Sequence, residues 1–186
     1  MKKTMQTLCS AALFSASQLT SAQTTPTPAP APAAAPAAAT SAPCISAEHH
    51  AFDFWIGHWD VFKPDGSLAG SNKIEREYNG CVIHERYTTP HGFAGESLNA
   101  YDSARKVWHQ TWMDNGGTVL LLDGGIQGNS MVLLGNGQDS AGKQIRHRIT
   151  WTPKADGNVR QHWESTDEKG NWTTVFDGLY KRKTSK

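Results

Sequence analysis

The sequence predicts an all-β domain over residues 44–186, an antiparallel, up-and-down closed barrel of about ten strands. From Phe54 onward, nine turn signals rich in Gly, Asn, Asp and Pro recur at short intervals. The segments between them are rich in β-branched and aromatic residues and show no sustained helical period. The connections are too short for parallel crossovers, and a meander of this length closes or splits to remove its edges.

Residues 1–22 are expected to form a signal peptide. Two lysines precede a short apolar stretch, Leu8 to Leu19, and small residues stand before a cleavage site at Gln23. The apolar stretch is too short for a membrane span. We therefore expect export to the periplasm or beyond, without membrane insertion after cleavage.

Residues 23–43 are expected to be a disordered linker. They contain six Pro, nine Ala and no charge, a composition that keeps a chain extended and cannot bury apolar side chains. A spacer that holds the domain away from the cell envelope and a merely tolerated tail both fit this composition.

The charge of the mature chain argues against a nucleic-acid partner. The full sequence has 18 basic and 17 acidic residues, and loss of the two signal-peptide lysines leaves 16 against 17. Binding to nucleic acid requires a basic excess that this balance does not provide.

Cys44 and Cys81 are the only cysteines of the mature chain, because Cys9 leaves with the signal peptide. Export places them in an oxidising compartment, which predicts a disulfide between them. Two unpaired thiols are the alternative. No CxxC and no close Cys/His spacing indicates a metal site, and we expect none.

The turns divide the domain into segments whose alternation separates two faces. The turns are predicted at residues 64–66, 79–80, 90–92, 102–103, 115–117, 123–125, 135–137, 155–157 and 169–171. The tryptophan-bearing faces are Trp55, Gly57, Trp59 and Val61 in the first strand, Trp108, Gln110 and Trp112 in the fifth, His147, Ile149 and Trp151 in the eighth, Val159, Gln161 and Trp163 in the ninth, and Trp172, Thr174, Phe176, Gly178 and Tyr180 in the tenth. The opposite faces of the eighth and ninth strands are charged, so the tryptophans should point inward.

Five stretches, residues 52–61, 80–85, 108–114, 148–153 and 176–180, carry a family resemblance. They resemble the DUF1579-like group of bacterial proteins of unknown function. The resemblance implies a calycin-superfamily barrel, related in architecture to lipocalins, fatty-acid-binding proteins and nitrobindin.

The same resemblance assigns a structural role to the Gly-x-Trp motif. In calycins this tryptophan closes one end of the barrel beneath a cation from the last strand. Gly57 and Trp59 match the motif, and Arg182 is the expected cation, with Lys181 as the competing candidate.

The resemblance also bears on haem, which nitrobindin-like barrels bind through a His near the C-terminal end. The last strand, Trp172 to Lys183, contains no His. The nearest, His162, is out of phase with Trp163 and should point outward. We therefore expect no haem and no other cofactor.

Aromatic and amide side chains share the predicted interior and form the candidate ligand site. The candidate ligand-binding residues are Asn99, Trp108, Gln110, Trp112, Trp151, Gln161 and Trp163. A mostly aromatic cavity with a few polar groups is typical of small-molecule sites, which predicts a small apolar or aromatic ligand. A filled core whose polar groups satisfy one another is the alternative.

Two other functions stay open at this stage. The sequence has no nucleophile elbow, P-loop or dinucleotide motif, so we assign no catalytic residue and favour binding over catalysis. An enzyme would need a buried acid or His in the cavity, and His147 is the candidate. Glu75, Glu77 and Glu85 lie on adjacent predicted strands; we expect them on a charged outer face or in cross-strand pairs with Arg76 and Arg86, and a carboxylate pair for acid–base work is the alternative. An envelope interaction module would instead show a filled barrel and an exposed apolar patch outside it.

Overall fold

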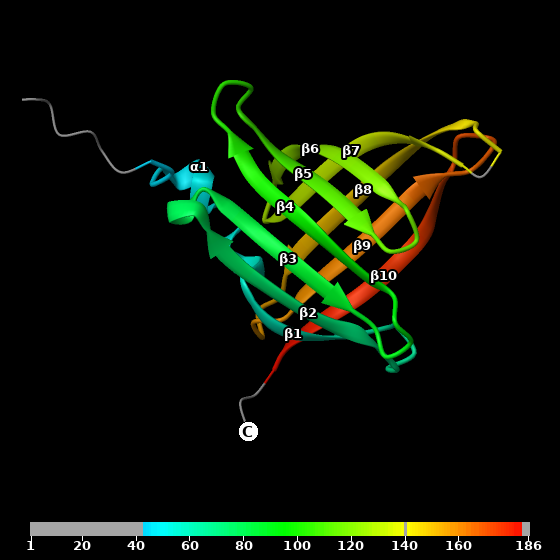
Figure 1. Ribbon diagram of the computed structural model, residues 1–186, viewed down its shortest axis with the longest axis horizontal. Helices are drawn as coiled ribbons and strands as arrows, with labels where there is room; N and C mark the ends of the chain where they lie inside the picture. The colour runs from blue at the N-terminus through cyan, green and yellow to red at the C-terminus, as the bar shows by residue number, and fades with distance from the viewer. Residues whose placement is uncertain (1–42, 140, 184–186) are drawn as a thin grey trace, which may run out of the picture. The chain divides into compact units, whose positions relative to one another are not determined.

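Ten antiparallel strands form a closed barrel in the computed structural model, which describes residues 43–139 and 141–183 (Figure 1). The strands are β1 Gly57–Phe62, β2 Leu68–Glu77, β3 Val82–Thr88, β4 Ala94–Asp102, β5 Val107–Asp114, β6 Val119–Gln127, β7 Ser130–Gln138, β8 Gln144–Pro153, β9 Val159–Thr166 and β10 Trp172–Arg182. Each strand pairs with its sequence neighbours, and β1 pairs with β10. The predicted fold class is confirmed. The predicted signal peptide, and the linker up to residue 42, lie outside the described residues.

Short helical elements precede the first strand. They are α1 Ala47–His50 and the 3-10 helix η1 Asp53–Trp55, and a second 3-10 helix, η2 Tyr78–Gly80, connects β2 to β3. Trp55 therefore lies in η1 rather than in the first strand as predicted, although its side chain is fully buried. None of these described helices is long and apolar enough to cross a membrane.

The predicted disulfide between Cys44 and Cys81 is confirmed. It joins the start of the segment that carries α1 and η1 to the residue that follows η2. This segment is thereby attached covalently to the barrel wall next to β3.

The Gly-x-Trp motif has the predicted contact with the last strand. The Arg182 guanidinium carbon lies 4.3 Å from the ring centroid of Trp59, and Trp59 Nε1 donates to the Trp55 carbonyl at 2.9 Å. Lys181 lies over Phe62 instead. Gly57 has φ +151°, and a Cβ there would lie 2.4 Å from Arg182 Nη1, so the backbone and the packed cation both favour glycine.

Two predicted turns are wrong, because residues 123–125 lie within β6 and residues 135–137 within β7. A Cβ on Gly124 would lie 2.1 Å from the Val132 carbonyl oxygen, and one on Gly135 would lie 2.2 Å from that of Leu121. These glycines allow close approach of neighbouring strands, which is the other common use of glycine in a sheet.

A β-bulge reverses the predicted face of the first part of β10. The register with β9 shifts between Thr174 and Phe176, so one extra residue, Val175, enters the strand. Trp172 consequently lies on the outer face, with the Arg148 guanidinium 4.3 Å from its ring centroid. Thr174 contacts the outward-facing His162. The predicted inward direction is thus wrong for Trp172 and Thr174, and correct for the buried Tyr180.

Candidate functional site

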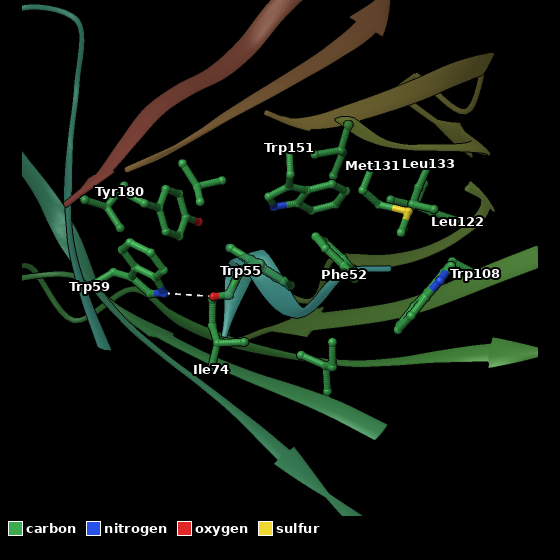
Figure 2. Close-up of a cluster of buried hydrophobic side chains, with 14 of the residues drawn as sticks. Phe52, Trp55, Trp59, Ile74, Trp108, Leu122, Met131, Leu133, Trp151 and Tyr180 are labelled. Carbon is green, nitrogen blue, oxygen red and sulfur yellow. Dashed lines mark hydrogen bonds between the residues drawn. The ribbon is translucent and has the colours of Figure 1, made fainter. Parts of the chain in front are cut away.

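Aromatic side chains fill the end of the barrel next to the α1 segment (Figure 2). Phe52 stacks on Trp55 with a centroid distance of 4.8 Å, and Phe52 also makes edge contacts with Trp108 and Trp151 at 5.6 and 5.2 Å. Trp108 Nε1 donates to the Glu48 carbonyl at 3.0 Å. We call this cluster of Phe52, Trp55, Trp108 and Trp151 the aromatic plug. It contains two of the predicted ligand-binding residues, Trp108 and Trp151.

A chain of hydrogen bonds follows the inner face of three neighbouring strands, β5, β4 and β3, and ends at a carboxylate. Gln110 Nε2 donates to Asn99 Oδ1 at 2.8 Å, and Asn99 Nδ2 donates to Ser97 Oγ at 2.9 Å. Ser97 Oγ donates to Glu85 Oε2 at 2.6 Å. Two more predicted ligand-binding residues, Asn99 and Gln110, therefore have protein partners, and Asn99 Nδ2 also donates to the Ile83 carbonyl at 3.0 Å.

A second set of polar groups reaches Glu85 from the opposite side. Asn72 Nδ2 donates to Glu85 Oε1 at 2.7 Å and to Tyr180 Oη at 3.2 Å. The Tyr180 hydroxyl donates in turn to Gln161 Oε1. Asn72 Oδ1 is buried and has no hydrogen-bond partner among the described residues.

Glu85 corrects a prediction, because its carboxyl group lies inside the barrel rather than on the charged outer face. Its side chain is 3% exposed, whereas Glu75 and Glu77 lie outside and pair with Arg86. Burial raises the Glu85 pKa to about 7, although hydrogen bonds from Ser97 and Asn72 and the nearby His84 act in the opposite direction. Glu85 therefore changes protonation close to neutral pH.

A cavity of about 190 Å³ opens above this network. Its lining residues are Glu85, Tyr87, Phe93, Trp112, Asp114, Leu120, Gln161, Trp163, Val175, Phe176 and Tyr180. One water molecule needs only roughly 10–15 Å³ on the same measure, so the space is much larger than a packing defect. We call it the distal cavity, because Phe93 precedes β4 whereas Tyr101, near the other end of β4, contacts His49 of α1.

The distal cavity combines aromatic walls with a polar base. Three predicted ligand-binding residues, Trp112, Gln161 and Trp163, line it. Trp112 Nε1 donates to Asp114 Oδ2 at 3.0 Å, which fixes the indole orientation. The barrel therefore holds a buried aromatic cluster and a cavity compatible with small-molecule binding.

His147, the predicted candidate for catalysis, is buried but does not line the cavity. Its Nδ1 accepts a hydrogen bond from Trp163 Nε1 at 3.2 Å, and burial lowers its pKa, so the ring is neutral at neutral pH. In the described part of the chain, no carboxylate is hydrogen-bonded to it. It supports Trp163 from behind.

Glu85, Tyr87 and Asn72 are interior polar residues that are not among the predicted ligand-binding residues. The alternation of Ile83, Glu85 and Tyr87 with the polar residues His84 and Arg86 was the available signal. It was overridden by the expectation that a glutamate faces water.

The described residues do not fit a haem or a metal centre. His162 lies on the outer face beside Thr174, and no His lines the distal cavity. Over residues 43–139 and 141–183, no three His, Cys, Asp or Glu side chains gather into a possible metal site. The chemistry available in the cavity is that of carboxyl, hydroxyl, amide and aromatic groups.

The closed ten-stranded barrel is consistent with a calycin-like fold. No protein-family model and no curated protein matches the sequence.

Proposed function

We propose that this protein binds a small, largely apolar or aromatic molecule in the distal cavity. The observation that carries the proposal is the cavity itself, about 190 Å³ with six aromatic residues and only a few polar groups in its lining. Aromatic walls cover an apolar body, and a few placed polar groups orient it. The binding residues are then Trp112, Gln161 and Trp163, joined by Glu85 and Tyr180.

Native mass spectrometry of the protein purified from its own host tests this function, because a bound molecule appears as added mass. A titration with benzyl alcohol, a neutral aromatic probe, adds a direct measurement. We expect Trp112→Ala to lower the affinity for the probe by about tenfold, which corresponds to a loss of about 1.4 kcal/mol of binding free energy. Trp172→Ala is the matched control, because Trp172 lies on the outer face and should not affect the probe.

Binding is rejected if no added mass appears and no aromatic probe, whether neutral, cationic or anionic, binds the wild-type protein. It is also rejected if Trp112→Ala and Trp172→Ala change the affinity equally, because the probe would then bind elsewhere.

A second candidate function is catalysis, and the observation that favours it is Glu85. A buried carboxyl group with a pKa of about 7 is suited to acid–base work in a cavity. However, the lining residues include no Ser, Cys, Lys or His that Glu85 would activate. Recovery of the bound molecule chemically unchanged after incubation supports binding, whereas conversion that depends on Glu85 supports an enzyme.

An interaction function is favoured by an apolar patch on the outer face of β4 to β7. Its residues are Leu98, Met113, Val119, Leu121 and Leu134, each more than two-fifths exposed. Such patches often mark contacts with other proteins. Self-association of the purified domain, measured by sedimentation and abolished by Leu121→Lys, supports this function; a monomer at every concentration argues against it.

We further propose that the chain is an exported member of the DUF1579-like calycins. The disulfide between Cys44 and Cys81 supports export, since disulfides persist in oxidising compartments. The mass of the protein isolated from the periplasm or medium tests this, because a mature chain should begin at Gln23 with both cysteines oxidised. An uncleaved, reduced chain in the cytoplasm contradicts it.

A further inference from the structure

The lining of the distal cavity contains acids but no bases. Its eleven residues include Glu85 and Asp114 and no Lys, Arg or His. Burial raises the Asp114 pKa, but hydrogen bonds from Trp112 and from the backbone of Thr118 and Gly116 lower it by more, so this carboxylate is ionised. The cavity is therefore attractive to cations and repels anions.

The base of the cavity offers acceptors to a ligand. Each Glu85 oxygen receives one protein donor, whereas a carboxylate accepts about four hydrogen bonds. Gln161 Oε1 accepts from Tyr180 and retains a second lone pair. Asn72 points its Nδ2 at Glu85, the orientation an ionised carboxylate requires, and its buried Oδ1 then has no partner within residues 43–139 and 141–183. The complement to such a base is a group with several N–H donors.

The walls favour the same ligand chemistry. Four aromatic side chains line the cavity around the Glu85 carboxyl group: those of Tyr87, Trp112, Trp163 and Phe176. Aromatic faces attract cations, and they also cover an apolar body. A charged amine with an apolar body therefore satisfies both parts of the lining.

We propose that the distal cavity binds a small primary amine, with its ammonium group on Glu85 and its apolar body against Trp112 and Trp163. The proposal rests on the proposed binding function and names the ligand class of that site. The ammonium would donate to the Glu85 carboxylate and to the amide oxygen of Gln161. Burial of an unpaired carboxylate is unfavourable in free energy, and a bound ligand of opposite charge offsets that cost.

Binding of an ammonium requires Glu85 to be ionised, so it depends on pH. The other titratable groups around Glu85 are Tyr87, Tyr180, Asp114 and, on the outer face, His84. Burial raises the pKa of Tyr87 to about 12 and holds the pKa of Tyr180 well above its ordinary value, so both stay neutral. We expect the amine affinity to rise with pH up to about 7 and then to level off until the amine itself loses its proton.

Calorimetric titration of the mature protein with three probes of one shape tests the proposal. The probes are benzylamine, benzyl alcohol and benzoate, which are cationic, neutral and anionic at about pH 8. We expect benzylamine to bind at least about tenfold more tightly than benzyl alcohol, and benzoate to bind most weakly. Equal binding of benzylamine and benzyl alcohol overturns the amine proposal but leaves the proposed binding function intact. Binding of none of the three overturns the amine proposal, and if native mass spectrometry also shows no added mass it overturns the proposed binding function too.

Glu85→Gln keeps the shape of the side chain and removes its charge. The substitution should lower the affinity for benzylamine by at least about tenfold and change the affinity for benzyl alcohol by less than about twofold. Glu75→Gln is the matched control, because Glu75 lies on the outer face and pairs with Lys73 and Arg86. An unchanged benzylamine affinity in Glu85→Gln rejects the proposal. If that variant does not fold, a flat pH profile of benzylamine binding to the wild-type protein rejects it instead.

Discussion

Ser97 Oγ lies 2.6 Å from Glu85 Oε2, and this contact links the filled half of the barrel to the distal cavity. On one side of it, Gln110 and Asn99 pass their donors toward Ser97. On the other side, the Glu85 carboxyl group contributes to the cavity lining. The same carboxyl group is thus both an acceptor in the hydrogen-bond network and part of the cavity lining, and burial, which raises its pKa to about 7, makes it sensitive to pH.

Glu85 should make the folded protein less stable as the pH rises. Its pKa is 4.5 when exposed and about 7 when folded, so the folded state binds the extra proton between these values. The free energy of unfolding should therefore fall across this window, by about 3 kcal/mol in total. His147, whose folded pKa is lowered, acts in the opposite direction as the pH approaches its ordinary value of 6.5 from below.

The measurement for Glu85 is urea unfolding of the wild-type protein and Glu85→Gln from about pH 4.5 to about pH 8. Subtraction cancels the His147 contribution. The difference should grow with pH in favour of the variant, and a difference that is independent of pH contradicts a buried, proton-bearing Glu85.

Gln110→Ala should destabilise the domain rather than act only on ligand binding. It removes the donor to the buried Asn99 Oδ1 and leaves that oxygen unsatisfied, at a cost of about 1–3 kcal/mol. Gln144→Ala, which removes an exposed amide from β8, should cost far less. Equal midpoints for the two variants in urea unfolding would show that the Gln110 amide has no role in the core.

Gly124→Ala should separate β6 from β7. The added Cβ would lie 2.1 Å from the Val132 carbonyl oxygen, a clash with backbone that costs about 1–3 kcal/mol to relieve. Gly125 is the control within the same strand, because a Cβ there meets nothing within 4 Å. Thermal unfolding of both variants is the measurement, and a Gly125→Ala variant at least as unstable as Gly124→Ala contradicts this strand packing.

Trp151→Ala and Trp172→Ala should differ strongly in stability. Trp151 is fully buried, and its loss should cost about 3–5 kcal/mol. Trp172 lies on the outer face under Arg148, where a cation–π contact contributes about 0.5–1 kcal/mol. Similar losses of unfolding free energy in the two variants, measured by chemical denaturation, would indicate that Trp172 lies in the interior and would contradict the bulge at Val175.

Removal of the disulfide should destabilise the domain by about 4 kcal/mol, since it closes a loop with a sequence separation of 37 residues. The double variant Cys44→Ser, Cys81→Ser should remain a β-barrel by circular dichroism but unfold at a lower temperature. An oxidised and a reduced protein with the same unfolding temperature would contradict a disulfide in the native chain.

Regular alternation and turn chemistry were sufficient to predict the closed ten-stranded barrel, whereas the Trp59–Arg182 contact was predicted from the family resemblance. The wrong predictions concern one strand face and two turns, where a single residue departs from regular alternation or from the usual role of glycine in turns. Val175 adds a residue to β10 and reverses the face of Trp172, and no local residue type marks such a bulge. Gly124 and Gly135 allow close strand approach, yet in sequence they are indistinguishable from turn glycines.

The candidate site was only partly predictable for a related reason. Alternation places Trp112, Gln161 and Trp163 inside the barrel, but it does not say which interior residues the α1 segment covers. Trp108 and Trp151 are covered by Phe52 and Trp55, and this depends on how the segment folds back onto the barrel. Glu85 required the alternation to be followed against the usual preference of glutamate for water.

The aromatic plug covers one end of the barrel, so the interior is not open at both ends. Trp55 and Phe52 are fully buried at the covered end, and the disulfide ties their segment to the wall. The proposed ligand would therefore enter and leave at the other end of the barrel, where Phe93 precedes β4 and Asp114 ends β5. On the proposed function, substitutions at that end would change its rate of exchange and its residence time without altering the core.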